Sequence, residues 1–272
     1  MTLEITSLGV RTSSGRELLR DISWSVPTGG RLGIIGESGS GKSLTAQAIL
    51  GLLPRGMDVT GSVQLDGEEM LGRSEKSLRQ LRGRRIAMVF QEPLTALDPL
   101  MPVGRQIQGP LHLHTELRGA AARKRMSQLL EQVALRDHER ILRSYPWELS
   151  GGQRQRVALA MALACEPDVL IADEPTTALD VTLQDEILTL LADLIERSGV
   201  TLVFVSHDLP VVARVADDLV VMRDGEVVET GSAREVLTIP TSDYARRLVE
   251  SARSVTALPT LGDPTADEEE TP

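Results

Sequence analysis

Gly36-Glu37-Ser38-Gly39-Ser40-Gly41-Lys42-Ser43 is the stretch that decides the fold of this 272-residue chain. The run Arg31 to Ile35, which suits a buried strand, leads into it, and residues 43–53 follow with the apolar spacing of a helix. Glycines let consecutive backbone N–H groups turn toward one anion, and the start of the helix adds its positive dipole end. A strand, a glycine loop and a helix in this order predict a phosphate-binding P-loop at residues 36–43.

Side chains in this loop and in a second motif have expected roles in phosphate chemistry. Lys42 is expected to reach the β- and γ-phosphates of a nucleotide, and the Ser43 hydroxyl to hold Mg²⁺. Asp173 and Glu174 end an apolar run, Val169 to Ala172, as expected for a buried parallel strand whose C-terminal tip faces the ligand. Asp173 would support the Mg²⁺ shell, and Glu174 would polarise the water that attacks the γ-phosphate. The alternative is an acidic pair that only caps the next turn, which the P-loop upstream disfavours.

A third motif, Leu149-Ser150-Gly151-Gly152-Gln153, precedes a good helix-forming stretch at residues 154–165. Ser150 is expected to be the N-cap of that helix, and the glycines would leave its first N–H groups exposed. On its own, the stretch fits an ordinary helix start equally well. Together with the other two motifs it looks like the signature sequence of ATP-binding cassette (ABC) ATPases.

The resemblance to the ABC family runs from about residue 3 to residue 250. It implies that Gln91 senses Mg²⁺ and the attacking water, and that His207 is the switch histidine at the γ-phosphate. It also implies that Ala178-Leu179-Asp180 is a loop that crosses a dimer interface. The resemblance implies that Ser43 and Gln91 are Mg²⁺ ligands and that Asp173 lies in the second shell of the ion. A histidine at this position would otherwise more often be structural, and its place in the order of motifs favours the catalytic interpretation.

The resemblance further implies that hydrolysis requires a dimer. In the family, the signature motif of one subunit closes over the γ-phosphate on the P-loop of the other. Here that motif is Ser150, Gly151, Gly152 and Gln153. The sequence leaves open whether the second ABC ATPase is identical or a paralogue.

One family feature is missing, the aromatic residue that usually stacks on adenine. There is none around Ser13 and Ser14, and Trp24 belongs to an alternating strand pattern elsewhere. Adenine would then be held by Arg11, Arg16 or an aliphatic side chain. The sequence has no Asn, so it lacks the Asn-Lys-x-Asp pattern by which many GTPases read guanine, and ATP is the expected nucleotide.

The predicted fold is α/β, a RecA-like P-loop core with an N-terminal antiparallel β subdomain and an inserted helical subdomain. Residues 92–158 are assigned to the insert because residues 102–140 show helical spacing and no run suited to a buried parallel strand. The remaining divisions of the predicted ABC domain at residues 1–256 are the core at 1–91 and 159–235, and a C-terminal family extension at 236–256. Residues 257–272 are predicted to be a disordered acidic tail.

Composition limits the other function classes. The chain has a formal charge of −10, of which the acidic tail supplies five charges, and no clustered basic and aromatic residues typical of nucleic-acid binding. Cys165 is the only cysteine, so neither a disulfide nor a cysteine-held metal can form within the chain. No stretch approaches the roughly 18 apolar residues of a membrane span, and no signal peptide opens the chain, so we expect a cytosolic ATPase.

Residues 90–99, 103–107 and 239–248 carry a more specific resemblance, to the oligopeptide, dipeptide and nickel importer family. The last stretch is a weaker form of the family's Pro-x-x-Tyr ending, with an extra residue and no His. The alternatives for these stretches are a surface loop and a final amphipathic helix.

The importer resemblance implies two membrane permeases that dock in a groove beside Gln91, and an extracytoplasmic solute-binding protein. The subunit would be peripheral, on the cytoplasmic face of the membrane. Alternatives are an exporter or lipoprotein-release ATPase, which should lack the 91–107 stretch and the Tyr244 ending, and a soluble ABC protein of repair or translation. Nothing in the sequence names the solute.

Overall fold

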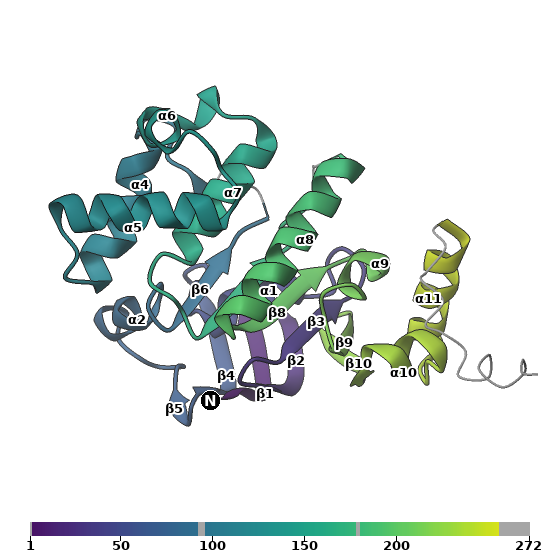
Figure 1. Cartoon of the computed structure of the whole chain (residues 1–272). Coiled ribbons are helices and arrows are strands. Elements are labelled where there is room, and N and C mark those ends of the chain that lie inside the picture. The colour runs from purple at the N-terminus through teal and green to yellow at the C-terminus, as the bar shows by residue number, and fades with distance from the viewer. Residues whose placement is uncertain (1, 92–95, 178–179, 256–272) are drawn as a thin grey trace, which may run out of the picture.

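The computed structural model describes residues 2–91, 96–177 and 180–255, and it contains two β-sheets (Figure 1). The smaller sheet is antiparallel, with strand order β2-β1-β4-β5. Its strands are β1 (Thr2–Thr12), β2 (Glu17–Pro27), β4 (Met57–Leu65) and β5 (Glu68–Glu69). Leu3 and Ile5 of β1 are buried while their neighbours Thr2 and Glu4 are exposed, the alternation of a strand that packs on one face. This is the predicted N-terminal antiparallel sheet.

The larger sheet has six strands in the order β10-β9-β3-β8-β7-β6. Only β10 is antiparallel to its neighbour. Strands β7 and β8 are buried along their whole length, which explains why they read in the sequence as continuous apolar runs. The strands are β3 (Arg31–Ile35), β6 (Ile86–Val89), β7 (Val169–Asp173), β8 (Thr201–Ser206), β9 (Asp218–Arg223) and β10 (Glu226–Ser232).

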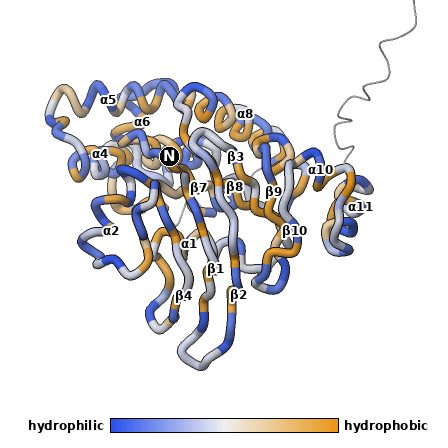
Figure 2. The backbone as a smooth tube through the Cα atoms, turned by 90° about the horizontal axis from the view of Figure 1, so that it is seen from below, coloured by the Kyte–Doolittle hydropathy of each residue, from blue (hydrophilic) through white to orange (hydrophobic). Residues whose placement is uncertain are grey.

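Helices cover the six-stranded sheet on both faces. On one face, α1 (Lys42–Ile49) packs between the two sheets, and Ile49 joins the same apolar cluster as Ile34. On the other face, α8 (Val181–Ser198) and α9 (Leu209–Val212) join a second cluster around Phe204. Figure 2 shows hydrophobic colouring along the strands of this sheet and largely hydrophilic colouring on the outlying helix α2 (Glu75–Leu81).

A group of helices lies beside β6, at one end of the larger sheet (Figure 1). Its buried side chains, among them Ile107, Leu129 and Val157, extend the second cluster. The helices are α4 (Val103–His114), α5 (Gly119–Gln132), α6 (His138–Arg143), the 3-10 turn η1 (Pro146–Glu148) and α7 (Gly151–Ala162).

Two helices, α10 (Ala233–Thr238) and α11 (Asp243–Val255), follow β10 at the opposite end of the sheet (Figure 1). Across the ranges that the structure describes, every helix is too short or too polar to cross a bilayer. Parts of three sequence predictions lie outside these ranges: residues 92–95 of the importer-like stretch, Ala178 and Leu179 of the interface loop, and the acidic tail.

Candidate active site

The P-loop joins β3 to α1 and rests on the end of β9. At Gly36 a Cβ would lie 2.1 Å from the carbonyl oxygen of Met222, and the backbone has φ +156°. The N–H of Gly225, in the turn after β9, donates to the carbonyl of Ser40 at 3.1 Å. Gly41 is the N-cap of α1 with φ +102°, in the left-handed region that favours glycine. The glycines at these two positions therefore let the loop approach the strand end and turn into the helix.

Lys42 is buried among backbone carbonyls of its own loop. Its Nζ donates to the carbonyl of Gly36 at 2.7 Å and to that of Glu37 at 2.9 Å. Burial lowers the pKa of Lys42, while the charges of Glu174 and Asp173 act in the opposite direction. The ammonium group is thus held at the phosphate-binding loop by contacts that a phosphate can replace, since an ammonium–phosphate hydrogen bond is stronger than one to a neutral carbonyl.

Ser43 and Asp173 meet at the start of α1. The Ser43 hydroxyl donates to Asp173 Oδ1 at 2.9 Å, and Asp173 is 4% exposed at the end of β7. Burial raises the pKa of Asp173, and the nearby Glu174 acts in the same direction, while the Ser43 hydroxyl and the charge of Lys42 oppose them. A hydroxyl beside a carboxylate fits Mg²⁺, which prefers oxygen ligands and keeps several waters or phosphate oxygens. The described residues contain no cluster of three His, Cys, Asp or Glu side chains that could hold an ion without such additional ligands.

The Glu174 carboxylate has three side-chain partners. Its carboxylate accepts Gln91 Nε2 at 3.0 Å and Thr177 Oγ1 at 2.9 Å, and His207 Nδ1 lies 3.1 Å from its other oxygen. Its backbone has φ +45°, and its N–H donates to the carbonyl of Val205 on β8 at 2.8 Å. The structure therefore brings Gln91 and His207 to the carboxylate, from elements far apart in the sequence. Thr177 is absent from the sequence-based site, because a threonine three residues after an acid carries no distinctive signal.

A cavity of about 650 Å³ opens over the P-loop. The wall includes the apolar side chains of Leu18 on β2 and Leu248 on α11, neither of which is a predicted site residue. Leu18 is an aliphatic side chain of the kind expected for adenine, whereas Arg11 pairs with Glu17. The other lining residues are Glu37, Ser38, Gly39, Gly41, Lys42, Ser43, Leu44, Gln91, Glu174, Thr177 and His207.

The signature motif lies apart from this cavity. Ser150 is the N-cap of α7, where its hydroxyl accepts the N–H of Gln153 at 3.3 Å and the side-chain oxygen Oε1 of Gln153 accepts the N–H of Ser150 at 3.1 Å. A Cβ at Gly152 would lie 2.5 Å from Leu183 Cδ1, so α7 approaches α8 closely here. Asp180 is the N-cap of α8 and accepts the N–H of Leu183 at 2.9 Å. In the single chain, Gly151 and its neighbours form a helix start rather than part of the P-loop cavity.

Comparison with known proteins identifies the class. The family model described as "ABC transporter" matches residues 19–177, and the chain belongs to this family of nucleotide-binding, ATP-hydrolysing domains. The predicted α/β fold is confirmed by solved structures. The dimeric ATP-binding cassette MJ0796 with ADP and Pi has a TM-score of 0.75 at 31% identity, covering 85% of this chain and 99% of that one. CbiO1 from Clostridium perfringens has a TM-score of 0.74 at 30% identity, covering 87% and 90%.

The curated relatives are transport ATP-binding proteins. The peptidoglycan transport protein YejF of Agrobacterium fabrum is 50% identical over 84% of this chain, which spans only 42% of that relative. The oligopeptide transport protein OppD of Bacillus subtilis is 43% identical over 95% of this chain and 72% of its own length. The metal-staphylopine import protein CntD of Staphylococcus aureus is 40% identical over 90% of both chains. The predicted resemblance to transporter ATPases is thereby confirmed.

Proposed function

We propose that the chain is the ATP-hydrolysing subunit of an importer for peptides or related small solutes, with metal chelates as a second possible cargo. The observation that carries the chemistry is the Glu174 carboxylate, which Gln91, Thr177 and His207 surround in the wall of the P-loop cavity. The cargo class is supported by the names of the relatives, which include oligopeptide, dipeptide and metal-staphylopine transport proteins.

In this proposal the P-loop binds the phosphates of ATP. The backbone N–H groups that follow Glu37 in the loop surround them, and Lys42 exchanges its two carbonyl partners for the β- and γ-phosphates. Ser43 and Asp173 would hold Mg²⁺ through their side-chain oxygens, and Gln91 lines the same cavity as Ser43. When bound, the metal neutralises charge that develops on the phosphate oxygens.

Glu174 is the general base in this proposal. One carboxylate oxygen accepts a proton from the water whose oxygen attacks the γ-phosphorus, and the bond to the bridging oxygen of the ADP leaving group breaks. Gln91 and Thr177 orient the carboxylate through the hydrogen bonds that they donate to it. His207, with a side chain that is 55% exposed, has its Nδ1 3.1 Å from Glu174 and can turn toward the γ-phosphate.

The site is incomplete without a second ABC subunit. Ser150 to Gln153 begin α7 and do not line the cavity over the chain's own P-loop, so a helix N-terminus is available to an anion on another subunit. Asp180 starts α8 beside Val181, which is 83% exposed and thus free to contact a partner. A closed dimer, of identical or paralogous subunits, would bring the partner's signature motif to each P-loop.

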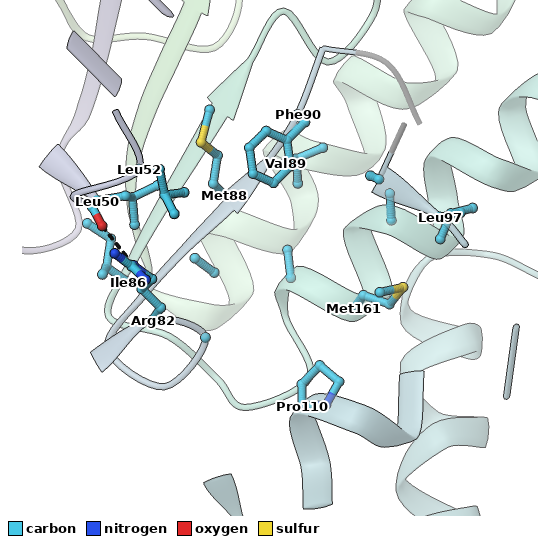
Figure 3. Close-up of a pocket in the computed structure, with 15 residues that line it drawn as sticks. Leu50, Leu52, Arg82, Ile86, Met88, Val89, Phe90, Leu97, Pro110 and Met161 are labelled. Carbon is cyan, nitrogen blue, oxygen red and sulfur yellow. Dashed lines mark hydrogen bonds between the residues drawn. The ribbon is translucent and has the colours of Figure 1, made fainter. Parts of the chain in front are cut away.

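A separate groove offers a docking place for the permeases. A hollow of about 280 Å³ lies between β6 and the helical part of the chain, and its wall is mainly apolar (Figure 3). Phe90 and Leu52 on its rim are 39% and 38% exposed. Because Phe90 directly precedes Gln91, a permease helix seated here would be one residue from the site of hydrolysis. This arrangement would place the subunit at the cytoplasmic face of the membrane, with the solute-binding protein reached only through the permeases.

The test is mass spectrometry of the proteins that co-purify with the Glu174→Gln variant from native membranes in ATP and Mg²⁺. Lys42→Ala, which lacks the cation facing the phosphates, is the control that should not assemble in an ATP-dependent way. Two permeases together with an ABC ATPase would support the importer. A fused exporter subunit, ribosomes or DNA-repair proteins would overturn the transport proposal in favour of an exporter or a soluble ABC protein.

A further inference from the structure

The start of the C-terminal helix α11 is fixed to β10. Glu229 on β10 is buried, and its carboxylate accepts the N–H groups of Thr241 and Ser242, each at 2.8 Å. Burial acts to raise the pKa of Glu229, but these hydrogen bonds outweigh it and hold the pKa below the ordinary value. The Ser242 hydroxyl accepts the N–H of Ala245 at 3.1 Å, which caps the first turn of the helix. These contacts give α11 a defined position against the edge of the sheet.

From that position α11 reaches the P-loop through Tyr244. This side chain is 5% exposed, and its hydroxyl accepts the N–H of Glu37 at 2.9 Å, across 207 positions of the sequence. The guanidinium of Arg223, at the end of β9, lies 5.2 Å from the centre of the tyrosine ring, within cation–π range. Burial raises the pKa of Tyr244, so the hydroxyl is a neutral phenol near pH 7. Leu248, one helical turn later, lines the nucleotide cavity.

Glu37 is held at both of its backbone groups. Its N–H donates to Tyr244, and its carbonyl oxygen accepts Lys42 Nζ at 2.9 Å. In the proposed reaction Lys42 turns to the phosphates, so the contact on the carbonyl side weakens when nucleotide binds. The contact on the N–H side involves no group that takes part in phosphate binding, and it can persist through the cycle.

We propose that Tyr244 is a positioning residue for nucleotide binding: through the Glu37 N–H it keeps the first turn of the P-loop in its binding shape after Lys42 has turned to the phosphates. The role rests on the proposed nucleotide site at residues 36–43. The C-terminal stretch at residues 239–248, so far only a mark of resemblance to the importer family, would thus have a role in the ATP cycle. Tyr244 acts through Glu37 and does not touch the reacting atoms.

The test compares ADP binding, with Mg²⁺, to the wild-type chain and to Tyr244→Phe by titration calorimetry. The variant keeps the ring and its contact with Arg223, and it loses only the hydroxyl. We expect the dissociation constant to rise about two- to tenfold, the effect of one neutral hydrogen bond. Tyr145→Phe is the matched control, because Tyr145 is the only other tyrosine and is 36% exposed beside η1, away from the lining of the cavity. Its dissociation constant should equal that of the wild type.

A second measurement separates positioning from mere stability. Hydrogen exchange in the wild-type chain should show the Glu37 N–H protected both without ligand and with ADP, and Tyr244→Phe should lose that protection in both states. An unchanged dissociation constant in Tyr244→Phe, with only a lower unfolding midpoint, would overturn the positioning role. A wild-type Glu37 N–H that exchanges freely would also overturn it, even if the variant failed to fold. Failure of the wild-type chain to bind ADP would instead refute the proposed nucleotide site itself.

Discussion

Replacement of Gly36 by alanine should damage the P-loop far more than the same change at Gly39. Both glycines have positive φ, +156° and +83°, so alanine is strained at either position. They differ in their surroundings. A Cβ at Gly36 would lie 2.1 Å from the backbone oxygen of Met222, whereas a Cβ at Gly39 would meet nothing within 4 Å.

The two costs can be estimated separately. At Gly39 the loss of unfolding free energy should come from backbone strain alone, roughly 1–2 kcal/mol. At Gly36 ordinary contact begins at 3.4 Å, so the loop must retreat by more than 1 Å from a carbonyl that cannot swing aside. The retreat would also weaken the 3.1 Å hydrogen bond from Gly225 to Ser40. Overpacking of this kind together with a lost hydrogen bond gives a total of about 3 kcal/mol or more.

The assay is urea unfolding of both variants without nucleotide, with linear extrapolation to water. We expect Gly36→Ala to lose at least about 1 kcal/mol more unfolding free energy than Gly39→Ala, since the clash adds to the strain. Equal losses in the two variants would refute the claim that the end of β9 supports the P-loop.

Three further changes test other parts of the structure. A Cβ at Gly33 would lie 2.2 Å from Val212 Cγ1, so Gly33→Ala should lower the unfolding free energy by about 1–3 kcal/mol. The double variant with Val212→Ala should lose at least about 1 kcal/mol less unfolding free energy than the sum of the two single losses. Additive losses in this double-mutant cycle would contradict the packing of α9 on β3. Asp173→Asn should raise the thermal unfolding midpoint without nucleotide at pH 7, because burial raises the Asp173 pKa and so disfavours the charged carboxylate in the folded chain. The same change should weaken Mg²⁺–ADP binding. The stability gain should shrink as the pH falls toward 3.8, where the wild-type carboxyl also becomes neutral, and a constant gain would contradict this explanation. Glu229→Gln should lower the unfolding free energy by about 1–3 kcal/mol at pH 7, since its amide can accept only one of the two N–H groups that start α11. The Glu229 pKa is lowered in the folded chain, so the stability that the carboxylate contributes is present above pH 4.5 and is lost as the pH falls through the folded-state pKa. A stability difference between wild type and variant that persists in acid would contradict the explanation by the charged carboxylate.

The sequence predicted the phosphate-binding core because its information is local. The strand, loop and helix around Lys42 follow one another along the chain, and the burial of β7 on both faces leaves a continuous apolar run before Asp173. The α/β fold with its antiparallel N-terminal sheet could be predicted for the same reason. The family resemblance then supplied Gln91 and His207, which spacing alone would not have placed beside Glu174.

The residues that the sequence did not reveal reach the site through tertiary packing. Leu18 lines the cavity because β2 passes beside the P-loop, and no local sequence pattern distinguishes this leucine from its neighbours. Thr177 becomes a partner of Glu174 only because the turn after β7 folds back toward the carboxylate. Tyr244 was recognised only as part of a family ending, and its contact with Glu37 depends on how β10 positions α11. Side chains of this kind need the three-dimensional arrangement before their role can be stated.

The most direct test of the proposed site measures ATP binding and steady-state ATP hydrolysis for the wild-type chain and Glu174→Gln in the same purified complex. If Glu174 is the base that takes the proton from water, ATP should bind the variant as it binds the wild type, while turnover falls by a factor on the order of 10² to 10⁴. Turnover that equals the wild-type rate would remove Glu174 from the mechanism and contradict the site as described.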